Sequence, residues 1–287
     1  MNHVAELGTI ITAIVTPFDA EYRVDEGAFV DLMHHLAAHG SDGFVVAGTT
    51  GEGSTLSDEE HLGLVELAIR EKPAGTTIIA NAGSNDTRHS LHLTEKATEL
   101  GADATLNVVG YYNRPNRRGI LQHYRAVAAA TDKPIVLYNI PARSTLNLDP
   151  ELLAELAQID HVDAVKQANS DELQLIDGLD VYAGNDDALA RAIEIGGAGG
   201  ILVASHLVGD LLAELATATP ERRAEIDGSL QDLYAVLGVT VNPIPVKAAL
   251  ELAGHPVGGL RLPLVEADED ERARIRAVLE GLGLLAG

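Results

Sequence analysis

A lysine ends an apolar run in the stretch AVKQAN, residues 164–169. Lysine is rarely buried unless it is paired or used chemically, because removing an ammonium group from water is costly. An amine held out of water loses its proton more readily, and the free amine attacks ketones and aldehydes to form a Schiff base. Lys166 is therefore a candidate nucleophile for metal-free aldol chemistry. The alternative is a structural lysine that is paired with a neighbouring aspartate.

Schiff-base chemistry also requires a proton shuttle and a binding place for a carboxylate. A tyrosine hydroxyl that is hydrogen-bonded to a threonine hydroxyl can move protons, and Tyr138 with Thr49 or Thr50 supplies this pair. The GTTGE loop, residues 48–52, offers backbone N–H groups and hydroxyls just before a predicted helix, which suits a carboxylate. Arg143 can bind a second carboxylate through two parallel hydrogen bonds.

The elements that must position these residues alternate along the chain. Eight short apolar runs, each separated by stretches of helical periodicity, begin at Thr12, Gly43, Thr77, Ala104, Ile135, Val162, Asp180 and Gly200. Eight strand–helix units with right-handed crossovers predict an α/β fold, a closed (β/α)8 TIM barrel. A doubly wound open sheet is the rival, but no G-x-G-x-x-G follows the first run. We expect a catalytic barrel over residues 1–219 and a C-terminal helical extension over 220–287.

The candidate residues fall where a barrel gathers its chemistry. In such barrels the active site lies at the C-terminal ends of the strands. The polar residues at or just after the predicted strands are Thr49, Thr50, Asn85, Tyr111, Tyr112, Tyr138, Arg143, Lys166, Asp186 and Asp187. Any one of them could simply cap the barrel, but their recurrence after six strands favours one shared site.

The composition excludes several classes of protein. The 287 residues include no cysteine, which rules out disulfides, thiolate catalysis and cysteine-ligated metal centres. The net charge of −23 argues against nucleic acid and anionic membranes as partners. No apolar run reaches the ~18 residues of a membrane span, and the opening MNHVAELGT does not resemble a secretory signal. We therefore expect a cytoplasmic protein.

Two other classes of function remain as alternatives. A metal-dependent aldolase or hydrolase could use histidine pairs one helical turn apart, His35 with His39 or His89 with His92. Neither pair lies at a strand end and no HExxH is present, so we expect no metal site and no cofactor. A non-catalytic barrel is the third class. It predicts loss of the lysine or the tyrosines, and both are present.

Motifs along nearly the whole chain are similar to those of one family. They are AIVTPF from Ala13, GTTGEG, YYNRP, LYNIPARS, AVKQAN, GGILVAS, NPIPVK and LRLP. Together they resemble the dihydrodipicolinate synthase and N-acetylneuraminate lyase family of lysine Schiff-base aldolases. GTTGE, NPIPVK and RLP resemble the synthase branch in particular. The resemblance implies a lyase that condenses pyruvate with L-aspartate 4-semialdehyde in the biosynthesis of diaminopimelate and lysine.

The resemblance also implies roles for individual residues. Lys166 would form the Schiff base with pyruvate, and Tyr138 would relay protons with a threonine, for which Thr49 is favoured. Tyr112, the second tyrosine of YYN, would reach across a tight dimer interface into the neighbouring site. The implied assembly is a homotetramer built from tight dimers.

The remaining roles concern the substrates. Thr50 is favoured for the carboxylate of pyruvate, and Arg143 would hold the carboxylate of the aldehyde. Ile201 would line the pyruvate pocket through its backbone. The chain departs from the synthases in KQANSD after the lysine, in VGYYN and in Gly53, which changes the pocket wall. A 2-keto-3-deoxy sugar-acid aldolase of the same family therefore remains the alternative.

Regulation by L-lysine is a further implication of the resemblance. The implied allosteric cleft contains Tyr111, Asn85 and, where inhibited members often carry a glutamate, His89. A neutral imidazole does not balance the charge of a lysine cation. Asp58 could compensate, but we expect it to be solvated in the first turn of its helix. We therefore predict weak or absent inhibition.

Overall fold

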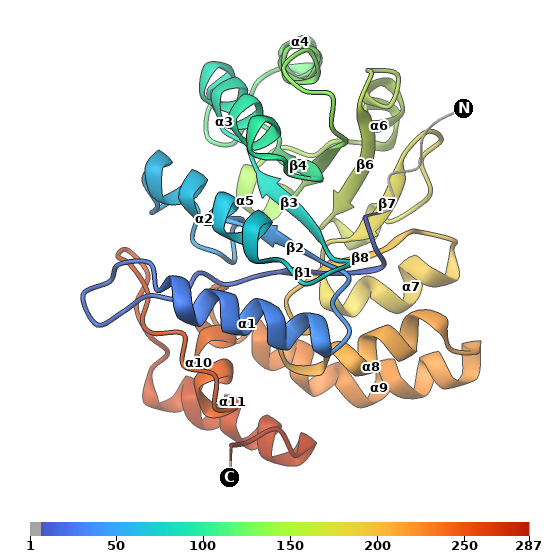
Figure 1. The fold of residues 1–287 in the computed structure, drawn as a ribbon. Helices are drawn as coiled ribbons and strands as arrows, with labels where there is room; N and C mark the ends of the chain where they lie inside the picture. Colours follow the sequence, from blue (N-terminus) through green and yellow to red (C-terminus); the bar gives the residue numbers. More distant parts are fainter. Residues whose placement is uncertain (1–6, 287) are drawn as a thin grey trace.

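Eight parallel strands close into a barrel in the order in which they occur along the chain (Figure 1). The computed structural model describes residues 7–286. The last strand pairs with the first, Ile11 opposite Ile201, and thereby closes the sheet. The strands are β1 (Ile10–Ala13), β2 (Gly43–Val46), β3 (Thr77–Asn81), β4 (Ala104–Val108), β5 (Ile135–Asn139), β6 (Val162–Gln167), β7 (Asp180–Ala183) and β8 (Gly199–Leu202). The predicted (β/α)8 barrel is confirmed.

Helices follow the strands and surround the barrel. They are α1 (Glu26–Ala38), α2 (Asp58–Glu71), α3 (Thr87–Leu100), α4 (Arg117–Ala128), α5 (Pro141–Ser144), α6 (Pro150–Leu156), α7 (Leu189–Glu194) and α8 (Ser205–Thr217), with short 3-10 helices η1 (Ser170–Glu172) and η2 (Asp186–Ala188). The starts of α2 and α6 are capped by side chains: Ser57 forms a capping box with Glu60, and the Asp149 side chain accepts from Leu152 N.

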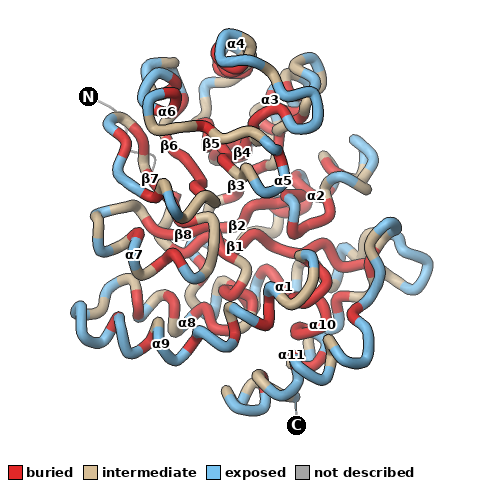
Figure 2. Tube along the Cα trace, turned by 180° about the vertical axis from the view of Figure 1, so that it is seen from behind, coloured by how far each residue is buried: buried red, intermediate tan, exposed pale blue. Residues whose placement is uncertain are grey.

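The strands are buried on both faces, which explains why they read as nearly continuous apolar runs. In Figure 2 the strands are almost wholly buried, whereas the outer helices alternate between buried and exposed residues. One apolar cluster fills the barrel interior and includes Ile11, Val45, Ile79, Val136 and Ile201. Larger clusters lie between the strands and the helices.

The first strand begins two residues before its predicted start at Thr12. The carboxylate of Asp42, just ahead of β2, accepts from the backbone N–H groups of Thr9 and Ile10. These two hydrogen bonds hold the start of β1 next to the start of β2. This contact joins residues more than thirty positions apart, so the local pattern around Thr12 could not reveal it.

Three further helices follow the barrel: α9 (Pro220–Leu237), α10 (Ile244–Leu252) and α11 (Glu269–Leu282). They pack against one another and against α8, on one side of the barrel (Figure 1). The extension therefore begins at Pro220, as expected, although its division from the barrel as a domain stays a prediction. Residues 1–6 and 287 of the two predicted ranges, with most of the opening MNHVAELGT, lie outside the described residues. Within 7–286, no helix is long and apolar enough to cross a membrane.

Candidate active site

Lys166 and Tyr138 lie side by side inside the C-terminal end of the barrel. They are register partners on β6 and β5, so their side chains point to the same face of the sheet. Lys166 is only 5% exposed, and its Nζ lies 4.6 Å from the centre of the Tyr138 ring. No ion pair joins Lys166 to a carboxylate in the described part of the chain. Its charge nevertheless acts on the nearby carboxylate of Asp186, without direct contact.

A cavity of about 410 Å³ opens over Lys166 and is called the Lys166 cavity below. Its wall is formed by residues at the ends of several strands and by residues of α5, η2 and the extension. It is lined by Thr49, Thr50, Tyr138, Ile140, Arg143, Lys166, Gly184, Asn185, Asp186, Asp187, Val203, Gln231, Tyr234, Ala235, Leu237, Gly238 and Asn242. Five predicted site residues thus meet in one cavity: Lys166, Tyr138, Thr49, Thr50 and Arg143.

The two predicted threonines differ in their surroundings. Thr50 is buried, whereas Thr49 is exposed and, like Tyr138, also lines a second cavity. Among residues 7–286, no hydrogen bond links the Tyr138 hydroxyl to either threonine. Thr49 and Tyr138 line the same two cavities, and the separate roles of the two threonines stay predictions.

The turn that carries these threonines has an unusual backbone. Ala47 and Glu52 both adopt left-handed conformations, which non-glycine residues seldom do. Gly53 has no room for a side chain, because an added Cβ would collide with the Ala47 carbonyl oxygen. Thr16, which follows β1, donates from its hydroxyl to Gly51 O over 2.6 Å and so ties the turn to the segment after β1. The surrounding structure must therefore stabilise this turn.

A buried ion pair supplies part of that stabilisation. Lys247 Nζ on α10 lies 2.6 Å from Glu52 Oε1, with side chains 1% and 0% exposed. Lys247 Nζ also donates to Gly259 O and lies 4.3 Å from the centre of the Phe18 ring. Burial lowers the pKa of Lys247, and the charge of Glu52 acts in the opposite direction. Through this pair, the C-terminal extension holds the loop of the barrel that carries the threonines.

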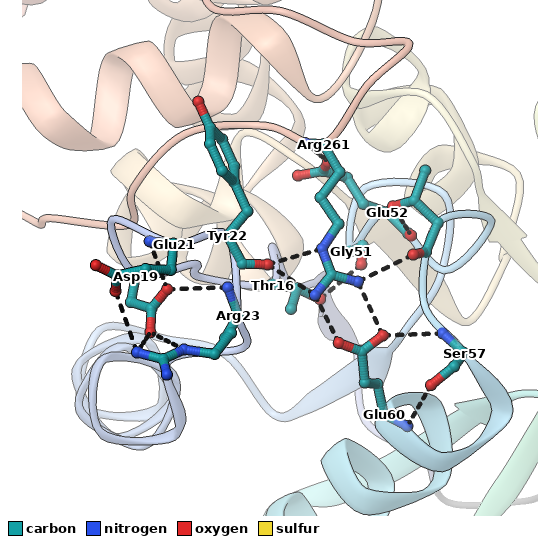
Figure 3. A network of polar contacts seen from close by, with 11 residues as sticks. Thr16, Asp19, Glu21, Tyr22, Arg23, Gly51, Glu52, Ser57, Glu60 and Arg261 are labelled. Carbon is teal, nitrogen blue, oxygen red and sulfur yellow. Dashed lines mark hydrogen bonds and ion pairs between the residues drawn. The ribbon is translucent and has the colours of Figure 1, made fainter.

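Arg261 ties the same loop to its neighbours, as Figure 3 shows. Its guanidinium forms hydrogen bonds with both carboxylate oxygens of Glu60, with Thr55 O and with Tyr22 O, and its backbone N donates to Glu52 Oε2. The Arg261 guanidinium lowers the pKa of Glu60 to about 2. Glu60 in turn accepts from Ser57 N in the capping box of α2.

Arg143 reaches the extension as well. It lies exposed on α5, and its Nη2 donates to Asn242 O over 3.1 Å. The Asn242 side chain donates from Nδ2 to Thr50 Oγ1 over 3.0 Å. Asn242, Lys247 and Glu52 were not predicted as site residues. Lys247 had a usable signal, because it interrupts the apolar run PVKAAL just as Lys166 interrupts its own run.

One of the two aspartates after β7, Asp186, caps backbone groups. Asp186 Oδ1 accepts from the backbone N–H groups of Val203 and Ala204, each over 2.9 Å. Burial raises the pKa of Asp186, while these two donors and the nearby Lys166 act in the opposite direction. In residues 7–286, no group of three or more histidine, aspartate or glutamate side chains is arranged to hold a metal ion.

A second cavity of about 460 Å³, called the Tyr111 cavity below, shares a wall with the first. Thr49, Tyr138 and Arg143 line both cavities, and Tyr111 and His89 line only the second. Two of the three predicted allosteric residues are thus brought together. Asn85 is not, because it lines an adjoining cavity of about 390 Å³.

Asp58 lies in the first turn of α2 and is largely solvated, as expected, but it also forms a contact that was not expected. Its Oδ1 lies 2.9 Å from His89 Nε2, and both residues line the Tyr111 cavity. Helices α2 and α3 pack side by side, and this packing brings the start of α2 next to His89. The cavity therefore contains a carboxylate, although the Asp58 side chain remains 54% exposed.

Besides Asn85, two predicted residues lie outside both cavities. Tyr112 is 89% exposed, has a left-handed backbone and lines neither cavity. Ile201 is buried in the barrel interior on β8, and its side chain does not line the Lys166 cavity. The predicted role of Ile201 concerned its backbone, which this placement leaves open.

A closed (β/α)8 barrel with a buried lysine beside a tyrosine at the C-terminal strand ends defines the class of Schiff-base aldolases. A family model described as "Dihydrodipicolinate synthetase family" matches residues 6–282. The chain belongs to this family, and the predicted family and enzyme class are confirmed.

Individual relatives agree with this family assignment. A 4-hydroxy-tetrahydrodipicolinate synthase of Cyanothece sp. is 42% identical, over 97% of this chain and 99% of the relative. The solved structure of a Cyanidioschyzon merolae enzyme with lysine bound is 38% identical, with a TM-score of 0.93 over 97% of this chain and 99% of that one. A pyruvate complex of the Acinetobacter baumannii enzyme is 33% identical, with a TM-score of 0.94 over 97% and 100%.

Proposed function

We propose that this chain condenses pyruvate with L-aspartate 4-semialdehyde, the reaction of a 4-hydroxy-tetrahydrodipicolinate synthase in lysine and diaminopimelate biosynthesis. The observation that carries the proposal is the buried Lys166 beside Tyr138, in a cavity that also contains Thr50 and Arg143. The relative from Cyanothece sp. is named for this reaction, and its similarity covers 97% of this chain.

The reaction begins at Lys166. Its amine adds to C2 of pyruvate, and loss of water gives the Schiff base, which acts as an electron sink. C3 then loses a proton, and the resulting enamine adds to the aldehyde carbon while the aldehyde oxygen takes up a proton. The amino group of the second substrate finally adds to C2 and displaces Lys166, which closes the ring of the product and restores the enzyme.

The other residues bind and move protons. Tyr138 and Thr49 carry protons to the departing water and to the aldehyde oxygen. Thr50 donates to the carboxylate of pyruvate, and the guanidinium of Arg143 binds the carboxylate of the aldehyde. No step requires a metal ion or another cofactor.

The relay is completed by a second chain. Tyr112 is too exposed to act in its own site, and a side chain in this position is suited to insertion into a neighbour. A tight dimer of this kind, two of which form a homotetramer, is part of the proposal. The cytoplasmic location stays a prediction.

A direct assay of the condensation tests the function. Pyruvate and L-aspartate 4-semialdehyde are expected to be consumed in equal amounts, and a chelator is expected to leave the rate unchanged. If pyruvate is bound covalently but this aldehyde does not react, the 2-keto-3-deoxy sugar-acid aldolase becomes the better assignment. Hydroxylated aldehydes are the substrates to try in that case.

The shared relay predicts complementation between two inactive chains. Tyr138→Phe and Tyr112→Phe are each expected to lower turnover by roughly 10²-fold, a typical contribution of general acid–base catalysis. Mixed oligomers of Tyr112→Phe and Lys166→Ala chains are expected to regain activity, because one site then contains both intact groups. Verified mixed oligomers without recovered activity would show that Tyr112 does not act in a neighbouring site.

Weak inhibition by L-lysine remains the prediction for the Tyr111 cavity. Asp58 is the carboxylate available to a lysine cation, but it is half exposed and already contacts His89. We expect inhibition only at millimolar or higher L-lysine, its loss in Asp58→Asn, and stronger inhibition in His89→Glu, which adds a carboxylate. Strong inhibition of the wild-type enzyme at sub-millimolar L-lysine would contradict this prediction.

A further inference from the structure

Two buried polar atoms in the wall of the Lys166 cavity have no hydrogen-bond partner among residues 7–286. They are Asn242 Oδ1 and the Tyr234 hydroxyl. Asn242 is the more informative of the two, because the other end of its amide is engaged. Its Nδ2 donates to Thr50 Oγ1 over 3.0 Å. One residue of the C-terminal extension thus contacts a predicted substrate-binding hydroxyl directly.

The contact determines which way the Thr50 hydroxyl can donate. A hydroxyl has one proton and two acceptor lone pairs. Because Thr50 Oγ1 accepts from Asn242, its proton is free for another acceptor, and the described residues provide none. Thr50 is 2% exposed, so water does not satisfy this proton readily. The Thr50 hydroxyl proton can therefore point only into the Lys166 cavity, where the substrate binds.

Residue 242 is itself held firmly. Its carbonyl oxygen accepts from Arg143 Nη2, and α10 begins two residues later with nearly every residue buried. Lys247 on this helix forms the buried ion pair with Glu52, two residues beyond Thr50. The extension is therefore joined to the GTTGE loop twice, and the second junction fixes where the Asn242 amide can reach.

We propose that Asn242 is a positioning residue whose amide directs the Thr50 hydroxyl proton toward the carboxylate of the 2-oxo acid substrate. The inference rests on the proposed function, since that substrate is the one attached to Lys166. Asn242 acts through Thr50 and is not itself a catalytic residue. A hydrogen bond to a carboxylate is stronger than one between neutral groups, so losing the correct orientation weakens substrate binding measurably.

A double-mutant cycle tests this coupling. The quantity measured is the pyruvate concentration that gives half-maximal borohydride-trapped adduct on Lys166, without any aldehyde present. Thr50→Val is expected to raise it by roughly ten-fold or more, and Asn242→Ala by several-fold. Adding Asn242→Ala to Thr50→Val is expected to raise it no further, because the group that it positions is gone. The maximal amount of adduct is expected to stay unchanged.

A second substitution at the same position sharpens the test. The carboxylate in Asn242→Asp can only accept, so the Thr50 hydroxyl donates to it and no longer to the substrate. The pyruvate concentration at half-maximal adduct is expected to rise at least as much as in Asn242→Ala. Asn242→Gln restores an amide donor and is expected to recover part of the affinity. Asn116→Asp, at the exposed N-cap of α4, adds the same charge elsewhere and keeps a capping oxygen.

The outcomes separate the inference from the proposed function. Additive effects in the cycle, or wild-type affinity for pyruvate in Asn242→Asp, would overturn the positioning role. Trapping of pyruvate combined with failure of L-aspartate 4-semialdehyde to react would overturn the proposed reaction and leave the cycle valid. A wild-type enzyme that forms no adduct on Lys166 would overturn both.

Discussion

Lys166→Ala is expected to lower the rate of condensation by at least roughly 10⁴-fold, as removal of a covalent nucleophile typically does. The reason is that no other described group lining the Lys166 cavity can form an imine with pyruvate, and the second buried lysine, Lys247, is paired with Glu52. The fold is expected to persist. Among residues 7–286, Lys166 forms no direct ion pair, and Asp186, whose pKa its charge lowers, keeps the backbone donors Val203 N and Ala204 N after the substitution.

Borohydride reduction tests the role of Lys166 directly, because it traps the imine. Wild-type chain treated with pyruvate and borohydride is expected to carry one stable adduct, which peptide mass spectrometry locates on Lys166. Lys166→Ala is expected to carry none. Lys96→Ala is the matched control, because Lys96 lies exposed on α3 and pairs with Glu99. An adduct on any other lysine, or no adduct, would refute the Schiff-base mechanism.

Lys247→Met is expected to lower the free energy of unfolding by about 3–5 kcal/mol, the usual effect of removing one partner of a buried ion pair. The substitution leaves the Glu52 carboxylate in the core without its cation. Urea unfolding at fixed protein concentration measures the change through the shift of the midpoint. Activity is expected to fall as well, since the pair supports the turn that carries Thr49 and Thr50.

Two further variants identify the cause of that loss. Adding Glu52→Gln to Lys247→Met removes the uncompensated charge and is expected to restore part of the stability, because the amide oxygen of the new side chain can still accept from Arg261 N. Lys72→Met breaks a comparable pair with Asp103 that is 28% and 34% exposed, and it is expected to lower stability by only about 1 kcal/mol or less. Equal losses in Lys247→Met and Lys72→Met would show that burial of the pair does not matter.

The strands and the central lysine could be predicted from the sequence because their signals are local. Strands buried on both faces appear as short apolar runs, and helices appear as three- and four-residue periodicity. A lysine within such a run stands out by composition alone, as Lys166 did. The same reasoning applied to PVKAAL would have found Lys247, but the residue that it pairs with would still have been unknown.

The placement of the other site residues depended on packing between distant elements. Tyr138, Arg143 and the two threonines line one cavity, because parallel barrel strands bring their C-terminal ends together. The sequence did not separate Asn85 from His89, which now line different cavities. It also missed the contact of Asp58 with His89, since that contact requires α2 to lie against α3.

The sequence by itself determined the barrel and the family and singled out Lys166, because apolar periodicity and residue type are properties of short segments. Only the tertiary structure decided that the C-terminal extension holds the active-site loop. The contacts that do so, Asn242 with Thr50 and Lys247 with Glu52, join residues about two hundred positions apart. Such pairs depend on how α10 packs against the barrel, and no periodicity within either segment encodes the partner across that distance.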